Sequence, residues 1–421
     1  MNKFVASLIA FYFVFGVVGY SVLHDYANFT YTDEITVSLL FCIALFPRRR
    51  RINVRDTRNM FMVIGIFTFY LFYSLKIGSN TRNAILMDFL IQIKPYIAFY
   101  STLIIAPNLT RERKFLKFIV LCAVPLLLVD PFISPVGDYF RILGHATFYS
   151  SSAIIIAFVY LYSKPRLTSV NLMVFCMLLS LSLFSLRVKA LVFWGVTVFL
   201  VVLIPGFRLK MSLKNGLLFV MMLSLAIALG YQKVQRYWDA SYDLNQMPAR
   251  MALYQGTIVL LKEHVPFGSG YASYATFTSG QFYSKTYYDL EFFRVQGLTP
   301  DKPIYVSDTY FPALAEFGVA GICLFAWFWL GILRTANRYR RQLGSPVVLK
   351  YTLFLLMVVF LMLQSVAAST LTHNAGVFVM ILLALCLTDL RREYESAMTG
   401  PMKSVRVKKD VFVHPDFSPR G

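Results

Sequence analysis

Long apolar runs separated by short polar connectors dominate the chain. A helix that crosses a bilayer needs about 20 mostly apolar residues. About twelve runs approach or reach this length, near residues 3–23, 32–47, 59–76, 84–106, 114–134, 145–162, 168–186, 188–205, 214–231, 308–333, 347–366 and 370–390. They lack the alternation of polar and apolar residues that is typical of outer-membrane barrel strands. The pattern predicts an all-α polytopic membrane protein with about twelve transmembrane helices.

One polar stretch, residues 231–307, interrupts this pattern as a single large loop. It separates nine predicted helices in residues 1–230 from three in residues 308–390, and a basic tail follows at 391–421. A membrane protein that builds one outer loop far larger than the others usually places substrate contacts there. We therefore look for function in this loop.

Within the loop, large apolar side chains recur at helical spacing between Pro248 and His264. They are Met251, Tyr254, Ile258 and Leu261. This spacing predicts an amphipathic helix on the membrane surface or on the helix bundle. Pro266, Gly268 and Gly270 then predict a tight turn, whose glycines would also let a ligand approach the backbone.

Composition agrees with a membrane protein, because 57% of the 421 residues are hydrophobic, 15% are charged and the mean hydropathy is +0.61. The net charge of +20 comes mostly from basic connectors, which twelve spans place on the same side as Lys3. Cytoplasmic loops carry such an excess of Lys and Arg, so both termini are predicted to be cytoplasmic. The large loop has seven basic and six acidic residues, so we expect no nucleic-acid partner.

The five cysteines, Cys42, Cys122, Cys176, Cys323 and Cys386, are scattered over the predicted helices without paired spacing. We therefore expect no disulfide and no metal site.

Ionisable side chains at the membrane boundary are the candidates for chemistry, because charge is costly there. Arg187 and Lys189 lie between the seventh and eighth runs, where they are either an interfacial pair or a clamp for phosphate. Arg250 begins the loop helix, whose N-terminus favours anions, although a surface salt bridge would also explain it. Lys262 and His264 lie at the other end of that helix.

Polar residues within or beside other runs carry less specific signals. Asp88 and Lys94 lie six residues apart. They could form a proton relay, part of a pocket wall or a structural pair. His373 and Asn374 begin the last run on the outer side, where a structural polar contact would also account for them.

Three segments resemble the O-antigen polymerase and O-antigen ligase superfamily of bacterial inner-membrane glycosyltransferases. They are Leu-Phe-Ser-Leu-Arg-Val-Lys-Ala at 183–190, the stretch from Arg250 through Lys-Glu-His-Val-Pro-Phe-Gly-Ser-Gly at 262–270, and Ser-Asp-Thr-Tyr-Phe-Pro-Ala-Leu-Ala-Glu-Phe-Gly-Val-Ala-Gly at 307–321. The first resembles a Ser-Arg-x-Ala element with one leucine inserted. Together they cover residues 170–335 directly.

The resemblance implies a GT-C-like fold with a large periplasmic loop, and a metal-independent glycosyltransferase without a cofactor. Its donor would be a glycan linked to undecaprenyl diphosphate, with the diphosphate bound by Arg187 and Arg250. Lys189 and Lys262 would add positive charge, and Tyr271 and Trp238 would stack on sugar rings unless they form an interfacial aromatic belt.

The ligase branch of the family carries a histidine where this chain has Ser307 and Asp308, which favours the polymerase branch. Asp308 is then a candidate general base for a sugar hydroxyl, or else a helix N-cap, and His264 is the alternative base.

The sequence thus predicts polymerisation of lipid-linked repeat units into O-antigen, capsule or exopolysaccharide at the bacterial inner membrane. The expected partners are the polyprenyl-diphosphate-linked glycan, membrane lipid, and a chain-length regulator and flippase. A ligase that transfers finished polymer to an acceptor is the first alternative. A polysaccharide transporter or flippase is the second, and a non-catalytic scaffold is a further rival.

Overall fold

The computed structural model describes residues 2–27, 29–46, 54–109, 113–133, 139–140, 142–203, 247–343 and 347–399. Helices account for most of these residues, and their sheet content is one antiparallel pair, β1 (Tyr139–Phe140) and β2 (Gly144–His145). The helices before the large loop are α1 (Asn2–Phe11), η1 (Tyr12–Val18), α2 (Tyr20–Ala27), α3 (Thr32–Leu45), α4 (Val54–Ile77), α5 (Arg82–Ile105), α6 (Arg113–Ile133), α7 (Ala146–Tyr162), α8 (Ser169–Ser180), η3 (Leu181–Ser185) and α9 (Val188–Leu203). Those in and after the loop are α11 (Ala249–Glu263), α12 (Phe277–Gln281), α13 (Lys285–Asp289), η6 (Phe292–Arg294), η7 (Pro312–Phe317), α14 (Gly318–Leu343), α15 (Val348–Ala367), η9 (Thr370–Thr372) and α16 (Asn374–Thr399).

Among the described residues, five helices are long and apolar enough to cross a membrane. They are Val54–Ile77, Phe115–Ile133, Pro312–Leu343, Val348–Ala367 and Asn374–Met398, and four shorter apolar helices accompany them. The predicted fold class, an all-α membrane protein, agrees with this, while the number twelve stays a prediction. The run at 32–47 forms α3, whose 14 residues extend roughly 21 Å, short of the about 30 Å hydrocarbon core. The run at 214–231 lies outside the described residues.

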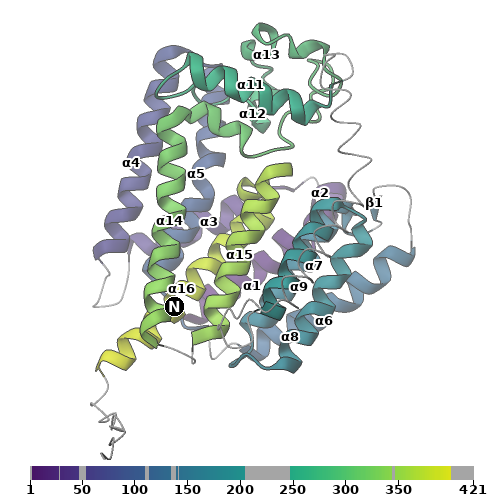
Figure 1. Ribbon diagram of the computed structural model, residues 1–421, viewed down its shortest axis with the longest axis vertical. Helices are drawn as coiled ribbons and strands as arrows, with labels where there is room; N and C mark the ends of the chain where they lie inside the picture. The colour runs from purple at the N-terminus through teal and green to yellow at the C-terminus, as the bar shows by residue number, and fades with distance from the viewer. Residues whose placement is uncertain are drawn as a thin grey trace, which may run out of the picture.

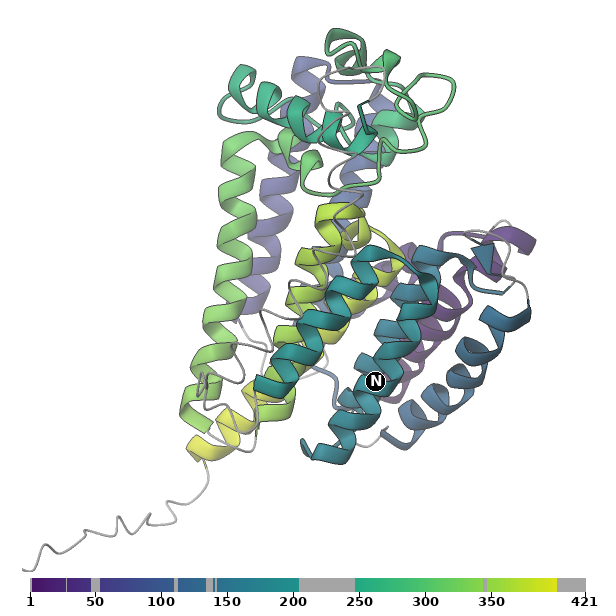
Figure 2. The same ribbon diagram turned by 45° about the vertical axis from the view of Figure 1, so that its right-hand side comes forward.

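The helices form two groups joined by α16 and α15 (Figures 1 and 2). Helices α4, α5 and α14 extend toward residues 247–317, which cap one end of the molecule. Helices α6 to α9 form the opposite flank. The apolar window of α16 is 83% buried, and α16 packs against both α5 and α15, which makes it the central helix. The C-terminal end of α16 lies at the end of the molecule away from the cap.

The cap has a hydrophobic core of its own, which includes Leu253, Tyr274, Tyr287, Phe292 and Val306. The predicted loop helix is present as α11, but the face that it buries in the core of the cap is not the one that the spacing of large apolar residues marks. The side chains that α11 buries are Ala249, Ala252, Leu253, Gly256 and Leu260, whereas Ile258 is 57% exposed. The spacing of large apolar residues missed this face because small residues form it. A Cβ atom on Gly256 would lie 2.3 Å from Oη of Tyr274. The helix can pack this closely on the core of the cap because Gly256 has no side chain.

The turn after α11 packs against the residues that lead into α14. Gly268 has φ +82°, and a Cβ there would lie 2.3 Å from the backbone nitrogen of Gly318. The backbone N–H of Gly270 donates to the carbonyl of Glu316 at 2.9 Å. The expected turn is confirmed, and its glycines let the chain approach the start of α14 rather than leaving room for a ligand.

Two buried carboxyl groups hold the cap in place, one from α5 below it and one from within the cap itself. Asp88 of α5 accepts the backbone N–H of Ala272 at 2.9 Å, and Glu316 of η7 accepts that of Tyr274 at 2.9 Å. Both side chains are fully buried. Asp88 therefore holds the cap, and the structural-pair alternative for Asp88 and Lys94 is wrong, because Lys94 pairs with Asp33 and Glu34 instead.

Candidate functional site

Three cationic side chains gather around Asp308 at the boundary between the cap and the helices. Arg250, in the first turn of α11, donates from Nε to Oδ2 of Asp308 at 2.8 Å and forms an ion pair with it through Nη2. Lys189 is close enough to Asp308, Arg250 and Arg187 to interact electrostatically with each. We call Arg187, Lys189, Arg250 and Asp308 the basic cluster.

The short turn between η3 and α9 positions the first two cations. Leu186 adopts φ +51° in this turn, and the carbonyl of Arg187 accepts the backbone N–H of Ala190 at 3.0 Å as α9 begins. Nη2 of Arg187 lies 3.0 Å from Nε2 of His145, and His145 caps the N-terminus of α7. The N-termini of α7 and α9 thus meet at Arg187, and both favour an anion.

The basic cluster is open to a ligand. The side chains of Arg250 and Asp308 are 41% and 30% exposed, so their ion pair is only partly covered. Three cations and one carboxylate leave a formal charge of +2. Guanidinium groups bind phosphate oxygens through paired hydrogen bonds, so this cluster suits a ligand with two phosphate charges.

Asp308 does not cap a helix. Its nearest following helix is η7, which begins at Pro312 and has Phe311 at its N-cap position. The N-cap interpretation of Asp308 was therefore wrong, and the carboxylate instead holds the guanidinium of Arg250.

A polar cavity of about 530 Å³ lies between the cap and the bundle. Its lining comes from α2, α3, α5, α12 and the segments around Ser307 and His373. Asp88 and Lys94 both line it, which confirms the pocket-wall interpretation for this pair. The cavity volume falls within the about 300–1,000 Å³ that is usual for small-molecule sites.

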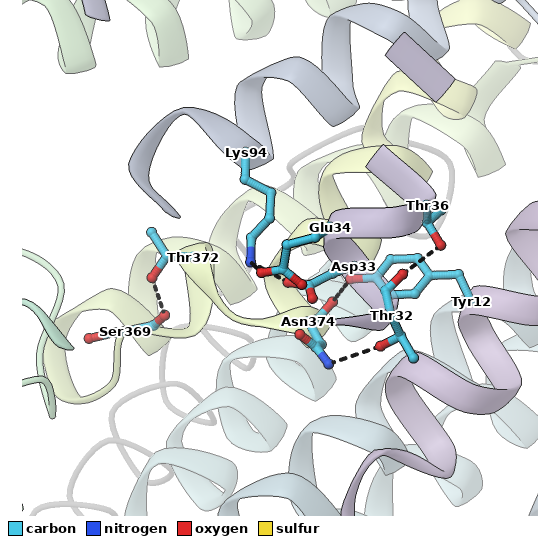
Figure 3. A network of polar contacts seen from close by, with 9 residues as sticks. All are labelled: Tyr12, Thr32, Asp33, Glu34, Thr36, Lys94, Ser369, Thr372 and Asn374. Atoms are coloured by element: carbon cyan, nitrogen blue, oxygen red, sulfur yellow. Dashed lines mark hydrogen bonds and ion pairs between the residues drawn. The ribbon is translucent and has the colours of Figure 1, made fainter. Parts of the chain in front are cut away.

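Lys94 and two acidic residues form one wall of the polar cavity (Figure 3). Lys94 reaches from α5 to Glu34, with Nζ donating to Oε1 at 2.6 Å, and it also forms an ion pair with Asp33. Asp33 is 1% exposed and Lys94 9%, whereas Glu34 is 44% exposed. Glu34 therefore presents a carboxylate to the cavity, while the ammonium group of Lys94 balances the charge of the buried Asp33.

The start of α16 is bonded to the same wall (Figure 3). The hydroxyl of Tyr12 donates to the carbonyl of Asn374 at 2.7 Å, and Nδ2 of Asn374 donates to Oγ1 of Thr32 at 3.4 Å. These bonds fix the position of the neighbouring His373.

His373 lines the polar cavity, and its side chain is exposed there. Desolvation by the surrounding protein, followed by the charges of Lys94 and Lys189, lowers its pKa to about 4. The imidazole is therefore neutral at pH 7. Lys94 belongs to the cavity wall and Lys189 to the basic cluster. His373 is therefore close enough to both parts of the site for their charges to act on its ring.

Hydrogen bonds from side-chain hydroxyl groups to backbone carbonyls also join the two parts of the site. Oγ of Ser369 donates to the carbonyl of Ser307, the residue before Asp308, and Oγ1 of Thr372 donates to the carbonyl of Ser369 at 3.1 Å. The segment that carries His373 is thus bonded to the segment that carries Asp308.

Other residues predicted for this site lie elsewhere. Lys262 and His264 are exposed at the far end of α11, and at 1.5 Å per residue they lie roughly 18 and 21 Å along the helix from Arg250. His264 thus cannot serve as the base at the atom held by Arg250. Tyr271 is 1% exposed and packs edge-on against Phe317, so no face of its ring is free to stack on a sugar. Trp238 lies outside the described residues.

The sequence did not single out Asp33 and Glu34, although it contained a signal for them. Both are ionisable residues at the start of the apolar run 32–47, where charge usually has a purpose. Their pairing with Lys94, some sixty residues later, depends on the packing of α3 against α5.

Comparisons of the chain with models of known protein families and with curated proteins found no match.

Proposed function

We propose that this protein polymerises glycan repeat units carried on a polyprenyl diphosphate, at the periplasmic face of a bacterial inner membrane. The observation that carries the proposal is the convergence of Arg187, Lys189 and Arg250 from two distant segments onto one partly exposed site. The three segments that resemble the O-antigen polymerase and ligase superfamily contain these same residues.

Charge supports a diphosphate in the basic cluster. A diphosphate that bridges a lipid and a sugar carries one negative charge on each phosphate. The cluster has a formal charge of +2, so such a ligand would be neutralised there. In the reaction, the bond between the donor sugar C1 and the phosphate oxygen breaks, and its electron pair leaves with the diphosphate. Preorganised cations stabilise this developing charge without reorganisation at the moment of reaction.

The new glycosidic bond forms when a hydroxyl of the acceptor repeat unit attacks C1 of the donor sugar. The hydroxyl proton must pass to a base during this step. Asp308 is the carboxylate of the cluster, and its contact with Arg250 positions the guanidinium for the diphosphate. The polar cavity beside the cluster leaves space for the acceptor sugar.

The proposal includes a membrane orientation with both termini in the cytoplasm, supported by the basic connectors and the nearly neutral loop. A flippase would deliver the repeat units, and a chain-length regulator would be a further partner.

The test is a size profile of lipid-linked and exported polysaccharide from the host. A deletion strain would be complemented with the wild-type chain, with Arg250→Ala or with Lys262→Ala. Lys262 is the matched control, because it is a cation on the same helix but far from the basic cluster. We expect single repeat units to accumulate in the deletion and Arg250→Ala strains and long polymer to form in the other two.

Different results would identify the rival functions. Long polymer that stays on its lipid carrier would indicate a ligase. Repeat units trapped on the cytoplasmic side, with Arg250→Ala behaving as the wild type, would contradict the enzyme proposal and indicate transport. Normal polysaccharide in the deletion strain would exclude any of these roles.

A further inference from the structure

The polar cavity differs from the basic cluster in the sign of its charges. Its lining contains Asp33, Glu34 and Asp88 but one lysine, Lys94. Asp33 and Asp88 are buried, so Glu34, which is 44% exposed, is the acidic group of this wall that would repel a diphosphate. Hydroxyl groups would be attracted, because carboxylates accept their hydrogen bonds.

Uncharged polar groups complete the lining. They include Thr30, Gln92, Thr276, Gln281, Ser307, Ser369, Thr372 and Asn374. Among them, Gln92 is 3% exposed, and its Oε1 has no hydrogen-bond partner among the described residues. A buried acceptor without a partner costs about 1–3 kcal/mol, so a ligand hydroxyl that donates to it would recover this free energy.

The lining also offers an apolar surface beside these polar groups. Phe277 is 51% exposed, and Tyr31 is 61% exposed. Exposed rings next to hydrogen-bonding groups suit a sugar, whose C–H face is apolar and whose hydroxyl groups are polar. The cavity thus combines the two kinds of contact that carbohydrate needs.

We infer that the polar cavity binds the acceptor sugar, and that His373 takes the proton from the hydroxyl that attacks the donor. This inference rests on the proposed function and assigns the second substrate and its base. The hydroxyl oxygen bonds to C1 of the donor sugar, the diphosphate leaves with the electron pair of the broken C1–O bond, and the proton passes to the imidazole.

The position of His373 supports this role, and its charge state permits it. It is exposed to the cavity, and the contacts from Ser369 to Ser307 join its segment to the basic cluster. The charged groups that act on it are Lys94 of α5, Lys189 of α9 and Glu34 of α3. With its pKa lowered to about 4, His373 is in the proton-accepting form at pH 7. Asp308 then remains the positioning residue for Arg250.

The first experiment measures turnover by the purified full-length protein. The probe is the lipid-linked repeat unit extracted from the deletion strain. His264→Gln is the matched control, since His264 is an exposed histidine at the far end of α11, away from the basic cluster and outside the cavity lining. Loss of a general base costs about 10²–10⁴-fold, so we expect His373→Gln to lose at least about 100-fold while His264→Gln stays within about twofold.

A rescue experiment separates chemistry from folding. Added imidazole should restore turnover to His373→Gly and leave Arg250→Ala inactive. Wild-type turnover by His373→Gln, with Arg250→Ala inactive, would overturn the inference while the proposed function stands. If the deletion strain accumulates no repeat units, the proposed function itself fails.

A second experiment tests the sugar site without relying on turnover. A photo-crosslinking amino acid would replace Phe277 in the cavity or Phe72, which is 66% exposed on α4. In the complemented host, we expect glycan to be captured at position 277 and not at position 72. An active variant that captures no glycan at position 277 would contradict the assignment of the cavity.

Discussion

Replacing Lys94 with methionine tests the charged wall of the polar cavity. The variant keeps most of the side-chain volume but removes the cation that compensates Asp33, which is 1% exposed. Breaking a buried ion pair by removing one partner costs about 3–5 kcal/mol, because the remaining charge is buried without compensation. The half-exposed Glu34 adds little, since water can solvate its carboxylate.

The corresponding change in melting temperature is measurable. Each kcal/mol shifts the midpoint by about 2–4 °C in chains of 150–250 residues and by less in longer ones. An unfolding entropy of about 2.1 cal/mol/K per residue gives roughly 0.9 kcal/mol/K for 421 residues, so we expect Lys94→Met to melt roughly 3–6 °C below the wild type. The melting midpoint would be measured by tryptophan fluorescence in lipid nanodiscs at a fixed scan rate.

A double-mutant cycle refutes or supports the reasoning. Adding Asp33→Asn to Lys94→Met removes the uncompensated carboxylate, so the double variant should melt above Lys94→Met. If the double variant melts lower, or if the two single losses simply add, the ion pair does not carry the stability of this wall.

Two further predictions concern the histidine of the cavity and the core of the cap. The folded-state pKa of His373, about 4, lies below its usual 6.5, so its contribution to stability is present above pH 6.5 and is lost as the pH falls toward 4. Thermal melts from pH 7.5 to 4.5 should show a smaller fall in melting temperature for His373→Gln than for the wild type. Equal falls would contradict the lowered pKa of His373. Gly256→Ala places a Cβ 2.3 Å from Oη of Tyr274, so overpacking should destabilise the cap by about 1–3 kcal/mol and speed its cleavage by protease. Gly331→Ala is the control, because no atom lies within 4 Å of its added Cβ, and equal cleavage of the two variants would contradict this packing.

Much of the fold follows from patterns within short segments of the chain. Long apolar runs identified the spanning helices such as α4 and α15, because length and hydropathy are local properties. The loop helix was placed correctly for the same reason. Its buried face was not, because Ala252 and Gly256 pack through small size, which a search for large apolar residues overlooks.

The site was harder to predict, because distant segments form it. Sequence reasoning selected Arg187, Lys189, Arg250 and Asp308 individually, and the structure brings these four together. It also offered His264, at the other end of the loop helix, as the alternative base. The length of α11 separates it from these four.

The central claim is that the basic cluster binds a diphosphate, and an equilibrium binding measurement tests it most directly. Calorimetry would compare undecaprenyl diphosphate binding to the purified wild type, Arg250→Ala and Lys262→Ala. A hydrogen bond to a charged group contributes about 1.5–3 kcal/mol, so Arg250→Ala should bind about 10- to 150-fold more weakly. Lys262→Ala should bind as the wild type does. Equal affinity of the wild type and Arg250→Ala would contradict the assignment of the diphosphate to this cluster.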